Sequence, residues 1–407
     1  MKSVDEHLDD CLRSIAPLDP IELQLLDAHG CSLAEDVVAP WDLPNFDNAS
    51  MDGYAVRFED LDAVRAGTPT EFPVYGDIPA GRPSALPLAP GTAMRIMTGA
   101  PIPDGCDAVI PVEWTDGGLA HAVFDRAPDL GGFIRRAGSD VRQGVTVLEE
   151  GTRLGPAQLG LLAAVGRDRV RCRPKPRVVV LSTGSELVEP GLPLQHGQIS
   201  ESNSFALTAA AKEAGALAYR VGIVGDDPRR LLDTIEDQLI RADLVVTTGG
   251  VSAGAYDVVK EVLLRLGTVD FDKVAMQPGM PQGRGTIGPD STPIFTLPGN
   301  PVSAFVSFEV FVRPVIRRML GVEPLERPTV RASCIEPLSS PQGKRQFARS
   351  WLSVEDGRYV VRPLGGQGSH LMNDLAHANS FIVVPEVVTE VPAGGTVTVM
   401  VLERRLS

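Results

Sequence analysis

The chain has 407 residues, of which 43% are hydrophobic and 22% are charged, a composition typical of globular proteins. Because a domain usually spans about 100–200 residues, this length predicts several domains. The formal net charge is −14, and no long run of lysine or arginine is present. This charge argues against a nucleic-acid-binding protein and against a polybasic membrane anchor.

The sequence contains no feature that is typical of secreted or membrane-inserted proteins. The N-terminal residues form no apolar signal segment, and no apolar run is long enough to cross a bilayer. The five cysteines are far apart and include no Cys-x-x-Cys pair, so neither a disulfide framework nor a zinc knuckle is indicated. We therefore expect a cytoplasmic protein without membrane insertion.

The first 172 residues predict a helix, a small β domain and a second helix. Apolar residues at helical spacing from Val4 to Ile15 predict a helix that ends before Pro17. From residue 40 to about residue 140, short β-prone pieces alternate with proline and glycine clusters, which predicts a small all-β domain. A short helix is expected at 156–165.

From residue 177 onward, strands and helices alternate. The expected strands are 177–181, 218–224, 244–248, 269–275 and 293–297, and the expected helices are 205–213, 228–240, 258–266 and 302–320. Repeated βα units predict a mostly parallel sheet with helices on both faces. We expect Ser202 or Asn203 to cap the first of these helices and Asp227 to cap the second.

The last 80 residues are again rich in β-strand patterns. Strands are expected at 329–335, 346–354, 359–362, 380–384 and 396–401. A small C-terminal barrel or sandwich is therefore predicted.

One strand-to-helix turn has the pattern of an anion site. The buried strand 244–248 is followed by Gly249 and Gly250, and Asp257 lies near the start of the next helix. Glycines let the backbone approach a phosphate closely, and free N–H groups at a helix start point toward it. The alternative is that the glycines serve only to reverse the chain.

Ligands of parallel sheets bind beyond the carboxyl ends of the strands, and polar residues follow several of the predicted strands. The residues that we collect there are Glu186, Asp226, Gly249, Gly250, Asp257 and the run Pro298-Gly-Asn-Pro-Val-Ser303. Three carboxylates beside glycine turns suit a divalent ion that bridges them to an anion. Alternatively, Glu186 is a solvated loop residue and Pro298 to Pro301 is a stiff turn that starts a helix.

Other charged residues have weaker signals. Lys273 and Arg349 could bind an oxyanion, whereas Lys344 and Arg345 fit a solvated face. The histidines, His370 included, have no metal-ligand spacing and are expected to be structural or exposed.

Taken together, six motifs resemble one known family. They are Ser50-Met-Asp-Gly-Tyr-Ala55, Arg95-Ile-Met-Thr-Gly-Ala-Pro101, Ser182-Thr-Gly-Ser-Glu186, Thr248-Gly-Gly-Val-Ser252 with Asp257, Leu297-Pro-Gly-Asn-Pro-Val-Ser303 and Gly368-Ser-His370. The set resembles the molybdopterin molybdenumtransferase family, known as MoeA in bacteria and as the E domain of gephyrin. The motifs span nearly the whole chain in family order.

The resemblance implies an architecture and an assembly. It implies an elongated domain made of residues 1–40 and 141–172, a β domain at 41–140, a molybdopterin-binding α/β domain at 173–326 and a C-terminal β-barrel at 327–407. It also implies a homodimer in which each active site combines residues of both subunits.

The resemblance further implies a reaction and a set of site residues. Family members insert molybdate into adenylylated molybdopterin with loss of AMP, in a step that depends on Mg²⁺. By matching motifs, Glu186, Asp226 and Asp257 would hold the metal ion. Gly249, Gly250 and Ser252 would lie near the ligand, and Asp52, Thr98 and Asp140 would reach in from the partner subunit. Lys273, Pro298, Asn300, Pro301, Ser303, Arg349 and Ser369 would surround molybdate and pterin.

One departure from the family pattern is important. Where many members have Lys-Pro-Gly-Lys-Pro, this chain has Gln277-Pro-Gly-Met-Pro281. Losing two ammonium groups should weaken oxyanion binding, because charge-assisted hydrogen bonds are about twice as strong as neutral ones. The departure leaves two alternatives to the transferase: a gephyrin-like dimeric scaffold that binds a partner's peptide, and a family member that handles tungstate.

Overall fold

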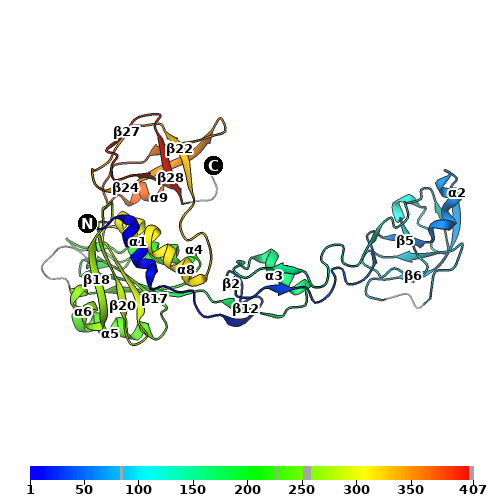
Figure 1. Cartoon of the computed structure of the whole chain (residues 1–407), viewed down its shortest axis with the longest axis horizontal. Helices are drawn as coiled ribbons and strands as arrows, with labels where there is room; N and C mark the ends of the chain where they lie inside the picture. The colour runs from blue at the N-terminus through cyan, green and yellow to red at the C-terminus, as the bar shows by residue number, and fades with distance from the viewer. Residues whose placement is uncertain (83–85, 226, 251–257, 403–407) are drawn as a thin grey trace.

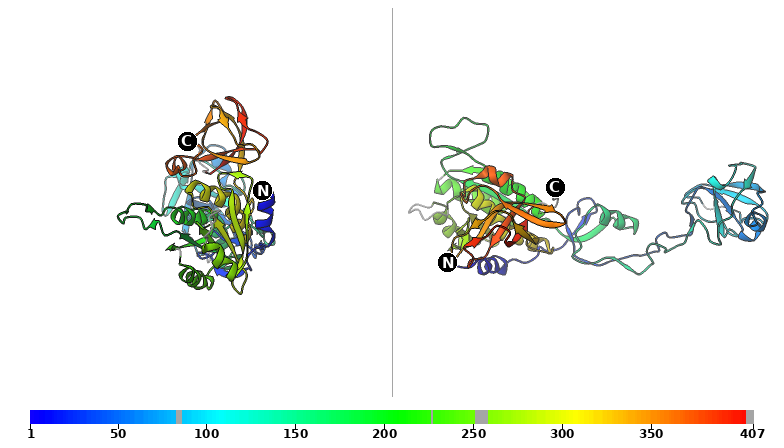
Figure 2. Two further views of the ribbon diagram at one scale, coloured as in Figure 1. Left: turned by 90° about the vertical axis from the view of Figure 1, so that its left-hand side faces the viewer. Right: turned by 90° about the horizontal axis from the view of Figure 1, so that it is seen from above.

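The computed structural model describes residues 1–82, 86–225, 227–250 and 258–402. Figure 1 shows an elongated molecule with a large body at one end, a small β domain at the other, and a slender middle part between them. Seen from above, the connection to the small β domain narrows to two chain segments (Figure 2). None of the helices in the described ranges is both long and apolar enough to cross a membrane.

The large body contains a six-stranded central sheet with the strand order β16-β13-β17-β21-β20-β18. Its strands are β13 (Arg177–Thr183), β16 (Leu217–Val224), β17 (Leu244–Thr248), β18 (Gly267–Lys273), β20 (Pro281–Ile287) and β21 (Thr292–Leu297). The first four strands in that order are parallel, and the last two pair antiparallel. A two-stranded ladder of β14 (Leu187–Val188) and β15 (Ile199–Ser200) lies outside it.

Helices cover both faces of this sheet, because its inner strands are apolar on both sides. Successive residues of a strand point to opposite faces, and in β13 Val178 and Val180 enter one core while Val179 and Leu181 enter another. The first core is covered by α1 (Val4–Arg13), α4 (Asn203–Ala214) and the continuous helix of α7 (Pro301–Ser307), the π-helical segment η3 (Phe308–Val312) and α8 (Arg313–Leu320). The second is covered by α5 (Pro228–Leu239) and α6 (Val258–Leu266).

The slender middle part is built from two distant segments of the chain. Its elements are β1 (Ile21–Gln24), β2 (Ser32–Leu33), β3 (Val37–Val38), β11 (Thr146–Leu148), α3 (Pro156–Ala164) and β12 (Arg169–Arg173). Strand β12 pairs with β1 and β2, and β11 pairs with β3. The middle part is thus held together by pairing between residues 21–38 and residues 146–173.

The small domain at the far end has a five-stranded sheet in the order β8-β5-β7-β6-β9. Its elements are β4 (Asn48–Ala49), β5 (Gly53–Val56), η1 (Phe58–Leu61), α2 (Asp62–Arg65), β6 (Thr70–Ile78), β7 (Ala93–Ile96), β8 (Ala108–Pro111), η2 (Val112–Trp114), β9 (His121–Phe124) and β10 (Ile134–Arg135). Two apolar clusters form its core, and Tyr54 and Phe124 are among its fully buried side chains.

The C-terminal strands close into a barrel, because β24 pairs with β26 in addition to the order β24-β25-β22-β28-β26. The elements are β22 (Thr329–Cys334), β23 (Leu338–Ser339), β24 (Arg345–Glu355), β25 (Arg358–Pro363), α9 (Met372–Ala376), β26 (Ser380–Val384), β27 (Glu390–Val391) and β28 (Thr396–Val401). Strand β19 (Met276–Gln277) comes from the α/β part of the chain and adds to β24.

The fold class expected from the sequence is confirmed: an α/β part with a mostly parallel sheet, a flanking β domain and a C-terminal barrel. The proposed boundaries between the four domains stay a prediction. Three local expectations were wrong. Strand β20 was missed, the helix after Ser202 starts at Asn203 without a side-chain cap, and Arg345 is not part of a solvated face, because it pairs with Asp5 at 2.7 and 2.8 Å. The expected cap by Asp227 is confirmed.

Candidate functional site

A cavity of about 600 Å³ opens at the carboxyl ends of β13, β17 and β21. Its walls come from the loops that follow these strands, from the start of α4 and from a loop of the barrel domain. The lining residues that the sequence had singled out are Glu186, Gly249, Gly250, Asn300 and Pro301. They come from three separate loops, and the topology of the sheet brings these loops to one edge.

The turn after β17 requires glycine. Gly249 and Gly250 have φ angles of 94° and 69°, in the left-handed region that side chains with a Cβ rarely adopt. A Cβ on Gly249 would lie 2.4 Å from the carbonyl oxygen of Thr183. The turn therefore packs backbone against backbone and leaves the space in front of it to the cavity.

Asn203 joins two of the loops that line the cavity. Its Nδ2 donates to Thr248 Oγ1 at 2.9 Å and to the carbonyl oxygen of Gly299 at 2.7 Å. Thr248 Oγ1 in turn donates to the carbonyl oxygen of Pro298 at 3.0 Å. The sequence pointed to Asn203 only as a possible helix cap, and its position beside a helix start was the only available signal.

A second acidic residue at the cavity, Glu201, was missed by sequence reasoning and is not available to a ligand. Its side chain is 2% exposed and accepts hydrogen bonds from Ser182 Oγ, from the Ser204 backbone N–H and from Ser204 Oγ at 2.6–2.7 Å. Arg220 lies 3.5 Å from it and also pairs with Glu189. By contrast, the exposed carboxylate of Glu186 has no hydrogen bond to another described residue.

The predicted metal triad can be located only through one member. Asp226 and Asp257, together with Ser252, lie outside the described residues. Among the residues that the structure does describe, no group of three His, Cys, Asp or Glu side chains is arranged to hold a metal ion. Glu186 is therefore the one predicted ligand whose place in the cavity is known.

The barrel domain also contributes to the cavity. The backbone N–H of Val302, in the first turn of α7, donates to the carbonyl oxygen of Ser369 at 3.0 Å. This contact brings the neighbouring His370 into the lining. His370 was expected to be structural or exposed; it is exposed and also faces the cavity. Pro298 and Ser303 are buried beside these contacts.

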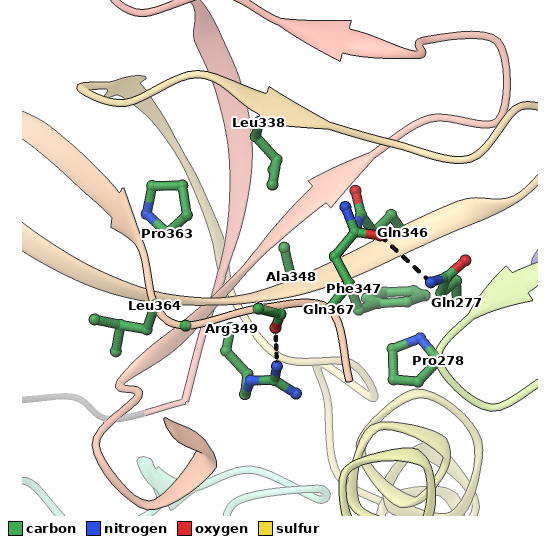
Figure 3. A pocket seen from close by; sticks show the side chains of 12 residues that line it. Gln277, Pro278, Leu338, Gln346, Phe347, Ala348, Arg349, Pro363, Leu364 and Gln367 are labelled. Carbon is green, nitrogen blue, oxygen red and sulfur yellow. Dashed lines mark hydrogen bonds between the residues drawn. The ribbon is translucent and has the colours of Figure 1, made fainter. Parts of the chain in front are cut away.

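Gln277 and Arg349 line a much smaller cavity of about 30 Å³ between β19 and the barrel (Figure 3). Gln277 Nε2 donates to Gln367 Oε1 at 3.5 Å. Arg349 is 5% exposed and donates to the carbonyl oxygens of Gly366 and, at 3.1 Å, of Gly368. Burial lowers the pKa of this guanidinium. Arg349 and Gln277 are thus together, but they do not line the cavity that contains Glu186.

Lys273 and Met280 flank the segment that carries Gln277. Lys273 ends β18 and is exposed, and Met280 is half-buried with its carbonyl oxygen bound by the Val274 N–H at 2.8 Å. Neither residue lines the large cavity.

The predicted residues of the β domain do not line this cavity, and two of them contact each other. Thr98 donates to Asp52 Oδ1 through its backbone N–H at 2.6 Å and through Oγ1 at 2.8 Å. The backbone hydrogen bond lowers the pKa of Asp52 most. Asp140 is exposed, and its N–H donates to the Leu43 carbonyl oxygen at 2.9 Å. Within one chain, strand β5, which directly follows Asp52, lies at the opposite end of the molecule from β17 (Figure 1).

The fold and the cavity together define a multidomain α/β protein with a ligand-sized pocket at the carboxyl ends of its parallel strands. Three family descriptions match the chain in sequence: the MoeA N-terminal region (domain I and II) at residues 2–166, a probable molybdopterin binding domain at 179–318, and the MoeA C-terminal region (domain IV) at 331–402.

Individual relatives agree with these matches. Molybdopterin molybdenumtransferase 2 of Mycobacterium tuberculosis is 48% identical over 400 residues, which cover 97% of this chain and 98% of the relative. The molybdopterin molybdenumtransferase of Haemophilus influenzae is 38% identical over 98% of both chains. A molybdopterin biosynthesis MoeA protein from Pyrococcus horikosii has a crystal structure that matches with a TM-score of 0.79 and 32% identity over 99% of both chains. The chain therefore belongs to the molybdopterin molybdenumtransferase (MoeA) family and is an enzyme of molybdenum cofactor biosynthesis.

Proposed function

We propose that this enzyme inserts molybdate into adenylylated molybdopterin and releases AMP in a Mg²⁺-dependent reaction. The observation that carries the proposal is the cavity of about 600 Å³ beside β17, lined by Glu186, the Gly249-Gly250 turn and Asn300. A pocket of this size suits a nucleotide-like ligand, and it lies where parallel sheets bind such ligands.

The charge of the cavity supports a metal ion. Its described lining includes the carboxylate of Glu186 but no lysine or arginine, so a pyrophosphate group there would lack a counter-charge from these residues. Carboxylate oxygens are ligands that Mg²⁺ prefers, and Glu186 fits that role because it has no hydrogen bond to another described residue. A bound Mg²⁺ would neutralise the phosphates and polarise the anhydride bond. We propose Asp226 and Asp257 as the further ligands, on the sequence motifs alone.

The residues of the chain then have separate tasks. The glycine turn allows the backbone to approach the phosphate, and Asn203 holds that turn against the loop at Pro298. The amide of Asn300 makes no capping hydrogen bond in α7, so it is available to orient the ligand. We propose that Arg349, Lys273 and their neighbours act on the oxyanion and the pterin.

We also propose a homodimer with shared active sites. Asp52 and Thr98 lie at the far end of the same chain, so only a second copy can bring them to the cavity. Met51 and Met97, next to these two residues in the chain, are 37% and 45% exposed. Exposed apolar side chains beside fixed polar groups suit an interface with another protein surface.

A direct assay tests the reaction. Purified protein is incubated with adenylylated molybdopterin, molybdate and Mg²⁺, and AMP is measured by chromatography. We expect release that requires Mg²⁺, is strongly reduced in Glu186→Gln, and is unchanged in Glu390→Gln, an exposed carboxylate of the barrel. A folded dimer that releases no AMP would refute the transferase and favour the peptide-binding scaffold. Replacing molybdate by tungstate in parallel tests the oxyanion.

Subunit mixing tests the shared site. Asp52→Ala and Glu186→Gln should each release AMP only weakly when alone. If the site is shared, a heterodimer of the two variants contains one intact site and one with both defects, so unfolding and refolding the mixture should restore part of the activity. Mixtures that stay inactive although heterodimers form would refute the sharing.

A further inference from the structure

A second cavity, of about 300 Å³, lies far from the strand ends, where the slender middle part meets the α/β part. The middle part supplies the turn at Gly30 and the start of α3. The linker supplies Lys175, and α4 and the turn that ends it supply Lys212 and Gly215. It shares no lining residue with the cavity that contains Glu186.

The lining of this cavity is basic. Arg153, Lys175, Lys212 and His29 line it, and none of the described lining residues is an aspartate or glutamate. This is unusual in a chain with a net charge of −14, which has only six lysines in total. Two of the six are in this one cavity.

None of these cations is paired with a carboxylate of a described residue, although the charge of Lys175 acts on the nearby Cys31 thiol. Arg153, Lys175 and Lys212 make no ion pair and no side-chain hydrogen bond with any other described residue. Two other cations of the α/β part, by contrast, are closely paired: Arg177 lies 2.7 Å from Asp243, and Arg284 lies 3.2 Å from Asp10. Like charges gathered around one concave space repel one another, and an anion in that space would remove the repulsion.

The backbone around the cavity favours the same kind of ligand. Gly30 has a φ angle of 79°, and a Cβ there would lie 3.0 Å from Cε of Lys175. Glycine therefore leaves room for the lysine at the cavity. Gly155 and Gln158, at the N-terminal end of the nine-residue helix α3, also line it. The positive end of a helix dipole favours an anion.

We infer that this cavity is a second ligand site, separate from the catalytic one, that binds the phosphate group of a small molecule. Arginine offers a fork of donors that matches a phosphate, and the lysines add mobile point charges. The volume admits a phosphate with a small attached group, so free phosphate and a phosphate ester are both possible sources of the same chemistry.

The experiment is a titration at constant ionic strength. Inorganic phosphate and AMP are titrated in separate runs into the full-length protein, and binding is followed by calorimetry. The test variant is Lys175→Met with Lys212→Met, which keeps the aliphatic stems. The matched control is Lys344→Met, a lysine of the barrel that does not line this cavity. Glu186→Gln serves as the second control, because it alters the catalytic cavity only.

We expect the wild type and both controls to bind phosphate alike, and the double variant to bind about ten-fold more weakly or worse. An ester is identified as the ligand if AMP binds more tightly than phosphate and this tighter binding is lost in the double variant, because AMP that the double variant still binds is held in the Glu186 cavity. Tighter binding of phosphate, lost in the same variant, would identify free phosphate. Equal binding by the double variant and the wild type would overturn the inference. A changed molar mass of the double variant in light scattering would also overturn it, because the cations would then face a second copy of the chain.

Discussion

Two carboxylates that contact the same arginine should differ sharply in what they contribute to stability. Arg327 donates to Glu309 at 2.7 and 3.1 Å and to Glu213 at 2.7 Å. The side chain of Glu309 is 0% exposed, whereas that of Glu213 is 59% exposed. Arg313 lies 3.9 Å from Glu309 as well, and burial lowers the pKa of its guanidinium to about 10. Glu309 is thus the buried counter-charge of two buried guanidinium groups.

The substitutions are Glu309→Gln and Glu213→Gln. Removing one partner of a buried ion pair costs about 3–5 kcal/mol, because a charge is left without compensation. Removing an exposed partner costs about 1 kcal/mol or less. Arg327 stands just before the barrel, so the loss should appear as easier opening where the barrel joins the α/β part.

Hydrogen exchange is the suitable measurement, because a chain with several cores does not unfold in two states. In peptides covering residues 309–334, a loss of 3 kcal/mol corresponds to exchange that is about a hundred-fold faster. Glu213→Gln should change it less than about ten-fold. If the two variants accelerate exchange equally, burial is not what decides the contribution of these carboxylates.

Three further predictions concern the site and the N-terminal helix. Asn203→Ala removes two hydrogen bonds worth about 1 kcal/mol each, so binding of the pterin substrate, measured by equilibrium dialysis, should weaken about ten-fold or more; unchanged binding would contradict the role of Asn203 between the loops. Gly249→Ala should abolish AMP release, because its Cβ meets a backbone oxygen at 2.4 Å, whereas Gly191→Ala, at a similar φ of 91° with open space around it, should keep the activity; equal activities would contradict the packing argument. Burial lowers the pKa of His7 from 6.5 to about 4. Below about pH 6.5, His7 is therefore protonated in the unfolded chain but still neutral in the folded chain. The free energy of unfolding should fall by up to about 3 kcal/mol as the pH approaches 4. The protection of helix α1 against hydrogen exchange, corrected for the intrinsic exchange rate, should depend less on pH in His7→Gln than in the wild type in this window. An unchanged pH dependence would count against the burial of a neutral imidazole.

Local sequence was sufficient where one physical requirement determined the residues. Strand β17 was predicted with the bounds that it has, 244–248, because a strand buried on both faces needs an unbroken β-branched and apolar run. The same holds for helix α6 at 258–266, with its apolar residues at helical spacing. The cap of α5 was also predictable, because an aspartate before a proline is typical of a helix start. The Asp227 side chain accepts hydrogen bonds from the backbone N–H groups of Arg229 and Arg230, which have no partner within the helix.

Strand β20 could not be predicted, because close pairing with its neighbouring strands requires glycines, and glycine disfavours strands. It pairs with β18 on one side and β21 on the other. A Cβ on Gly285 would lie 2.0 Å from the carbonyl oxygen of Thr268, and one on Gly283 would lie 2.9 Å from the ring of Phe271. Glycine is therefore needed for the pairing, while the local preference of glycine is against a strand.

Asn203 could not be identified for a related reason. Its two partners are 45 and 96 residues away in the sequence, at the ends of two other strands. An asparagine beside a helix start matches a cap equally well, and only the parallel order of the strands brings the three loops together. The site was therefore predictable as a set of loops, but the hydrogen bonds that hold the loops together were not.

The position of Gln277 in the fold limits which part of the site the departure from the family's Lys-Pro-Gly-Lys-Pro pattern can affect. The side chain lies with Gln367 and Arg349 at the small cavity between β19 and the barrel, and not in the cavity of Glu186. On the proposed function, the nucleotide end and the oxyanion end of the reaction are thus served by different groups of residues. On the same proposal, the neutral amide of Gln277 would act at the oxyanion end, where Arg349 of β24 already donates to the carbonyl oxygens of Gly366 and Gly368. The glycine turn, Asn203 and Glu186 line the other cavity, so on the proposed function the departure at Gln277 leaves the residues assigned to the phosphates unchanged.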